Sequence, residues 1–86
     1  MAEQWMDELT GKIRNIVGDE KAVHYQMNII PRIVMDFYRM LRESEAGRQV
    51  SEDYQMEDGS MRISLTGEKD CKGNCKVNRV DVKKNT

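Results

Sequence analysis

The sequence has no apolar run that approaches the roughly 18 residues required by a membrane-spanning helix. Its first twenty residues include Glu3, Asp7 and Glu8 and lack the apolar stretch of a secretory signal peptide. These two absences predict a cytoplasmic protein, and in that compartment cysteine thiols remain reduced.

The chain also has few of the residue types that build metal and catalytic sites. It contains one histidine, His24, and two cysteines, Cys71 and Cys75. A structural zinc ion needs about four ligands, so Cys71 and Cys75 are only weak candidates for a metal site, unless two chains share it. Their CxxxC spacing differs from the CxxC of thiol redox motifs. We expect free thiols, with a disulfide or redox switch as the first alternative and a metal as the second.

His24 follows Glu20 by one turn of the expected helix, a spacing that suits a general base. No nucleophile or cofactor motif accompanies the pair. The sequence therefore predicts no enzyme and no cofactor.

Apolar residues are scarce and charged residues abundant. The two classes make up 38% and 34% of the 86 residues, compared with ~45–50% and ~25% in typical soluble domains. The apolar residues nevertheless recur at regular spacing, which favours one small folded domain, residues 1–86, over disorder. A core this thin favours support from a partner chain.

The first half of the chain predicts helices. Residues 2–17 show helical periodicity and end at Gly18. A second helix is expected over 20–45, kinked at Pro31, with a break near residues 28–31 as the alternative. One continuous helix over 2–45 is a further alternative to this helical hairpin. An apolar stripe at spacings of four and three residues runs along the second helix: Val23, Met27, Ile30, Val34, Phe37 and Leu41.

The second half predicts a loop followed by an antiparallel β-hairpin. Residues 47–60 are polar and acidic and are expected to form a loop, with at most a short strand near Tyr54–Met56. Residues 61–84 alternate as two strands around a turn at Gly73-Asn74. A two-residue loop pairs Leu65 with Val82, and a four-residue loop pairs it with Val80. A three-residue loop fits poorly, because it places Leu65 opposite Asp81. The fold class is therefore α+β, with helices in 1–46 and a basic β-hairpin in 61–84.

The absence of catalytic motifs, together with the broad apolar stripe, predicts a small protein-protein interaction module such as an inhibitor, adaptor or assembly factor. We expect a homodimer through the apolar face of the second helix. The predicted partner face consists of Val23, Met27, Ile30, Val34, Phe37, Tyr38 and Leu41.

A nucleic-acid-binding regulator is the alternative function. Residues 61–86 carry a formal charge of +4, whereas residues 1–60 carry −5. The candidate anion-binding residues are Lys69, Lys72, Lys76, Arg79 and Lys83. The basic segment has no aromatic side chain to stack on bases, which weakens this alternative.

Overall fold

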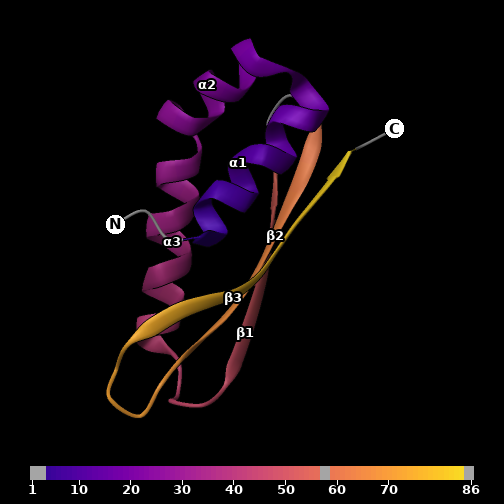
Figure 1. Ribbon diagram of the computed structural model, residues 1–86. Coiled ribbons are helices and arrows are strands. Elements are labelled where there is room, and N and C mark those ends of the chain that lie inside the picture. The colour runs from indigo at the N-terminus through magenta and orange to yellow at the C-terminus, as the bar shows by residue number, and fades with distance from the viewer. Residues whose placement is uncertain (1–3, 57–58, 85–86) are drawn as a thin grey trace.

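The computed structural model describes residues 4–56 and 59–84 and shows an α+β fold, with three helices followed by a three-stranded antiparallel sheet (Figure 1). The elements are α1 (Gln4–Val17), α2 (Asp19–Asn28), α3 (Ile30–Glu43), β1 (Gln49–Gln55), β2 (Met61–Lys69) and β3 (Cys75–Lys84). Within the described residues, no helix combines the length and the apolar character that crossing a membrane requires.

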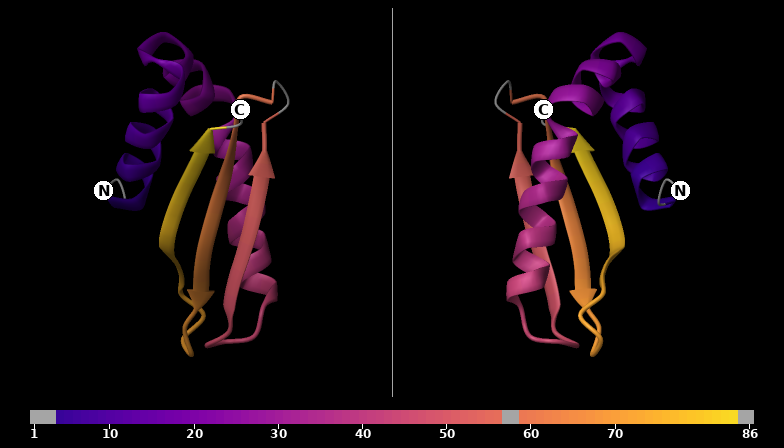
Figure 2. Two further views of the ribbon diagram at one scale, coloured as in Figure 1. Left: turned by 90° about the vertical axis from the view of Figure 1, so that its right-hand side faces the viewer. Right: turned by 90° about the vertical axis from the view of Figure 1, so that its left-hand side faces the viewer.

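The helices lie on one side of the sheet. The strand order is β1-β2-β3, so β2 is central. Figure 2 shows α3 running along one face of the sheet and α1 beside β3, while no helix covers the opposite face. Lys12 of α1 donates a hydrogen bond to the backbone oxygen of Val80 in β3, at 3.2 Å. This contact attaches α1 to an edge strand that would otherwise present unpaired backbone groups.

The core lies between α1, α3 and the sheet. Its largest fully buried side chains are Leu9, Ile13, Phe37, Leu41, Met61, Ile63 and Leu65. In β2 the apolar residues at alternate positions are buried and the residues between them are more exposed. The predicted strand alternation over residues 61–65 is therefore confirmed.

The predicted helical hairpin differs from the structure in its second helix. The chain forms two helices, α2 and α3, separated at Ile29, instead of one helix kinked at Pro31. Pro31 is the second residue of α3, where its missing N–H removes no helical hydrogen bond. The break expected as the alternative is therefore what the structure contains. Gly18, with φ of 86°, separates α1 from α2, which rules out a single helix over 2–45.

The apolar stripe does not continue across this break. α3 buries Ile30, Phe37 and Leu41, but α2 turns Ala22 and Tyr25 inward. Because the helix is interrupted at Ile29, residues of α2 and α3 no longer follow one helical repeat. Each helix therefore buries a face of its own.

The segment 47–60 is not only a loop, as β1 occupies Gln49–Gln55 and pairs with β2 along its length. Its residues facing the helices, Val50, Glu52 and Tyr54, are only half buried. Such a strand lacks the clear apolar alternation on which a sequence prediction depends. Glu57 and Asp58 of the predicted acidic loop lie outside the described residues.

The β2–β3 connection also differs from both expected turns. Lys69 pairs with Cys75, so residues 70–74 form a five-residue connection. The register then shifts between Thr66 and Gly67, and Leu65 pairs with Val80. This is the pairing expected for a four-residue loop, but the chain reaches it through a longer loop and a β-bulge.

Gly67 of β2 lies where α3 approaches the sheet closely. A Cβ atom at this position would clash with the backbone oxygen of Lys76 and would lie 3.2 Å from the Phe37 ring and 3.3 Å from Leu41. Glycine at this position therefore lets the two largest core side chains of α3 pack directly on the strand.

We expect Gly67→Ala to lower the free energy of unfolding by about 1–3 kcal/mol, because the added methyl group overpacks the core against backbone. Gly11→Ala is the control, since nothing lies within 4 Å of a Cβ at that position and alanine favours the helix by up to ~1 kcal/mol. Urea denaturation measures both. Equal stability of the two variants would contradict the close approach.

Candidate functional site

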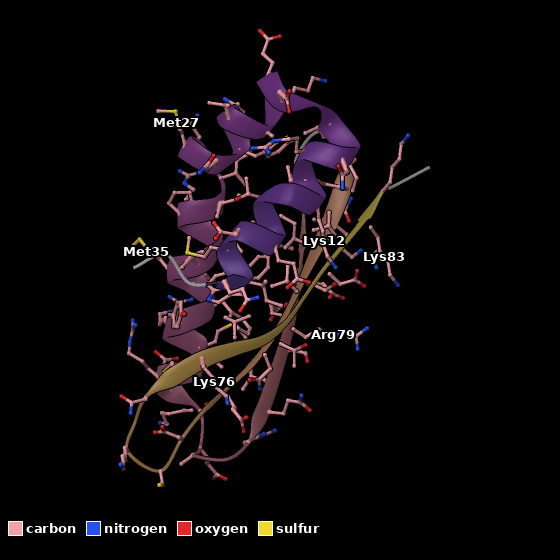
Figure 3. The ribbon with its side chains drawn as sticks, in the orientation of Figure 1. Lys12, Met27, Met35, Lys76, Arg79 and Lys83 are labelled. Atoms are coloured by element: carbon pink, nitrogen blue, oxygen red, sulfur yellow. The ribbon has the colours of Figure 1, made fainter. Side chains whose placement is uncertain are left out.

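Three large apolar side chains are exposed on the helical side of the molecule. Among the described residues, Val23 is 52% exposed, Met27 72% and Met35 73%. Figure 3 shows Met27 and Met35 projecting from the same side of α2 and α3, at the left of the molecule. Methionine is flexible and repacks readily, so such a surface suits contact with another protein.

An apolar groove lies beside Met35, between α1 and the junction of α2 and α3. Its volume is about 390 Å³. The residues that line it are Met6, Asp7, Thr10, Gln26, Ile30, Pro31, Val34 and Met35. Pro31 contributes to this groove because the interruption at Ile29 places it in the first turn of α3. The helix break therefore builds one wall of the groove.

A second hollow lies on the other side of Met35, along the exposed face of α3. It has a volume of about 380 Å³ and is lined by Met35, Asp36 and three arginines, Arg32, Arg39 and Arg42. We call these three residues the α3 arginines. Met35 lines both hollows, so it stands between an apolar groove and a cationic one.

Asp36, the one carboxylate that lines the cationic hollow, is already engaged. Its Oδ1 accepts a hydrogen bond from Arg39 at 2.7 Å, and its Oδ2 accepts one from the Tyr54 hydroxyl at 2.8 Å. Burial and the neighbouring Asp36 carboxylate raise the pKa of Tyr54 well above its ordinary value. Asp36 thus connects α3 to β1 and offsets the charge of Arg39.

The predicted partner face is only partly available. Ile30, Phe37 and Leu41 are buried in the core of this chain, and Val34 and Tyr38 are partly buried. Val23 and Met27 are the exposed members. Met35 was missed because it lies off the stripe, and only the position of the helix break identifies its surroundings.

The five candidate anion-binding residues do not form one surface. Lys69 donates a hydrogen bond to the backbone oxygen of Arg42, and Lys72 lies in the β2–β3 turn. Lys76, Arg79 and Lys83 are exposed on β3, and Figure 3 shows Arg79 and Lys83 on the opposite side of the molecule from Met35.

The uncovered face of the sheet mixes both charges. Arg62 lies opposite Lys83, which places two cations side by side. In the next row Ser64 lies between Asp53 and Asp81, and its hydroxyl donates a 2.6 Å hydrogen bond to Asp53. Rows of opposite charge alternate along this face, so its cations are largely compensated.

The cysteines lie at the β2–β3 turn, and both are free. Cys71 is exposed within the turn, and Cys75 is the first residue of β3. The Asp70 carboxylate organises the turn by accepting hydrogen bonds from the backbone N–H groups of Lys72 and Asn74, both at 2.9 Å. These bonds, that of Asn74 first, lower the pKa of Asp70.

Among the described residues, no group of three or more potential metal ligands gathers at one place. His24 is exposed, and its ring nitrogen Nδ1 lies 3.1 Å from the side-chain amide of Asn28. The described residues therefore do not bring His24 together with Cys71 and Cys75 in a group that could hold a metal ion.

Comparison of the chain with protein families, curated proteins and solved structures gives no match.

We expect Tyr54→Phe to lower the free energy of unfolding by roughly 1 kcal/mol at neutral pH, because the hydrogen bond to Asp36 is lost. In an Asp36→Ala background the same substitution should cost much less. In an ultraviolet titration, the variant should also lack the signal of one tyrosine that ionises at higher pH than free tyrosine. Because the folded pKa lies above the unfolded value of about 10, this stabilisation is complete at lower pH and declines in more alkaline solution. A Tyr54→Phe variant with an unchanged titration curve would contradict the assignment.

Proposed function

We propose that the protein is a non-enzymatic protein-binding module. Its contact surface is the outer side of α2 and α3, which we call the methionine surface. This surface consists of the exposed Val23, Met27 and Met35, together with Met6, Pro31 and Val34 of the adjoining groove. The observation that carries the proposal is the exposure of Met27 and Met35, at 72% and 73%, on the same side of the helices.

Burial of such side chains supports binding. Full burial of a methionine contributes about 1.5–3 kcal/mol. In a chain that has only 38% apolar residues, two methionines left outside the core are a substantial share of the available apolar surface. A groove beside Met35 gives a partner side chain a place to insert, as is typical of binding hot spots.

The occupant that we favour is a different protein. A symmetric dimer centred on Met35 would bring Arg32 of each copy close to Arg39 of the other. Repulsion between like charges disfavours that arrangement. The homodimer expected from the sequence therefore becomes an outcome of the experiment below.

We expect selection from a displayed random-peptide library to enrich peptides that bind the intact protein at the methionine surface. Met35→Ser should weaken their binding at least tenfold, equivalent to about 1.4 kcal/mol, because it removes the apolar contact. Lys83→Ser, a surface variant on the opposite side, is the control and should change affinity less than twofold.

Two other results would count against the proposal as stated. If no peptide is enriched, or if Met35→Ser leaves binding unchanged, the methionine surface is not a binding site. Light scattering after size-exclusion chromatography should show a monomer at micromolar concentration. A dimer that Met35→Ser dissociates would identify a second copy as the occupant.

Nucleic-acid binding is the second candidate, and one observation favours it. Arg62 and Lys83 are directly opposite on the uncovered face of the sheet, and like charges in that position are destabilising unless an anion lies between them. Asp53 and Asp81 lie in the adjacent row and oppose phosphate binding. We therefore rank this candidate below protein binding.

We expect no gel shift with duplex DNA or single-stranded RNA at low salt, because carboxylates alternate with the cations on this face. The variants Arg79→Glu and Lys83→Glu, which reverse two charges on this face, are assayed beside the wild-type protein. A shift in the wild-type protein that both substitutions abolish, and that weakens as salt rises, would assign the sheet face to nucleic acid.

A further inference from the structure

We propose that the partner segment is an acidic amphipathic helix that lies along α3, with its apolar side chains in the groove beside Met35 and its carboxylates on the α3 arginines. This inference rests on the proposed function and names the chemistry of the partner. It depends on the spacing of the arginines, on the absence of a described carboxylate beside two of them, and on the position of Met35.

The spacing places the arginines on one stripe of α3. Arg32, Met35, Arg39 and Arg42 follow one another at intervals of three, four and three residues. Residues at these intervals lie on one side of a helix, and the pattern is the one that accommodates a second helix packed alongside. All four line the same hollow. From Arg32 to Arg42 the helix rises by ten steps, which corresponds to about 15 Å, so a partner helix of three or four turns would cover the stripe.

The charge of this stripe is only partly compensated within the described residues. Arg39 is paired with Asp36 at 2.7 Å. Arg32 and Arg42 have no carboxylate within 4.0 Å among residues 4–56 and 59–84. Guanidinium groups stay charged at all physiological pH values and pair with carboxylates through two parallel hydrogen bonds. The stripe thus offers to a carboxylate-bearing partner two cations that no carboxylate of residues 4–56 and 59–84 pairs with.

Met35 determines that the partner is also apolar. It separates the apolar groove from the cationic hollow, and both hollows include its side chain. A segment that crosses Met35 therefore meets apolar side chains on one flank and arginines on the other. An amphipathic helix with carboxylates along one edge of its apolar stripe matches both flanks.

A polyanion fits this surface less well. A nucleic acid bound to the α3 arginines would leave the apolar groove beside Met35 uncovered. Exposed ion pairs contribute little affinity each, so we expect the arginines to determine which partner binds, while burial of Met35 provides most of the affinity.

The test uses two synthetic peptides with the same apolar stripe and similar helical content, one flanked by glutamates and the other by lysines. Protein labelled with ¹³C at its methionine methyl groups reports the contact. We expect the glutamate peptide to shift the signals of Met27 and Met35 and to leave those of the buried Met56 and Met61 unchanged. It should bind at least tenfold more tightly than the lysine peptide at low salt, and the ratio should shrink as salt screens the charges.

The variant Arg32→Gln/Arg42→Gln should reduce the preference for the glutamate peptide to less than threefold. The control Arg79→Gln/Lys83→Gln removes the same charge on the opposite side of the molecule and should preserve the preference. Thermal unfolding of both variants verifies that each remains folded. If both double variants lose the preference equally, net charge and not the α3 stripe is responsible, and the inference is overturned.

The failure of this inference is distinguishable from failure of the proposed function. Equal binding of the two peptides, or no binding of the glutamate peptide, overturns the acidic helix. The protein-binding function still stands if library peptides lose affinity in Met35→Ser. Displacement of the glutamate peptide by single-stranded RNA at lower concentration than by the unlabelled peptide would assign the stripe to a polyanion and overturn the inference as well.

Discussion

The contact of α3 with the sheet at Gly67 determines which residues the protein shows to its surroundings. Phe37 and Leu41 approach Gly67 so closely that a Cβ atom there would meet both side chains and the backbone. This packing fixes the rotation of α3 about its own axis. Met35 precedes Phe37 by two residues, which on a helix is about 200° of rotation, so burying Phe37 turns Met35 outward. The exposed methionine is thus a consequence of the core and not an accident of the surface.

The interruption of the helix at Ile29 also determines which apolar side chains are exposed. A continuous helix would have kept Val23 and Met27 in phase with Ile30, and all would have faced the core together. Because a new helix begins at Ile30, with Pro31 in its first turn, α2 buries Ala22 and Tyr25 and leaves Met27 exposed. Met27 and Met35 then project from the same side of two successive helices. The break between α2 and α3 therefore leaves Val23 and Met27 exposed while Ile30 of the same predicted stripe is buried.

The sequence was sufficient where a single periodicity governs burial and insufficient where packing between elements decides it. The strand at Met61–Lys69 could be predicted because its apolar residues alternate and its neighbours are polar. β1 could not, because Glu52 occupies a position that faces the helices at the edge of the sheet. The pairing of Leu65 with Val80 was among the expected registers, but the bulge that produces it was not expected, although an isolated glycine within a strand, here Gly67, is a signal for one. Of the methionine surface, the predicted stripe included Val23, Met27 and Val34, whereas Met35 was missed because it lies off that stripe.

Net charge along the chain does not by itself show which cations lack a neighbouring carboxylate in the folded protein. Residues 61–86 carry +4, yet on the uncovered sheet face their cations alternate with rows that contain Asp53 and Asp81. Residues 1–60 carry −5, yet they contain Arg32 and Arg42, which have no carboxylate within 4.0 Å among the described residues. The field near a surface depends on the charges within about 8–10 Å, the screening length at physiological salt. The arginines that we propose for contact with a carboxylate therefore come from the acidic half of the chain, because α3 places Arg32 and Arg42 beside Met35 with no carboxylate of the described residues within 4.0 Å.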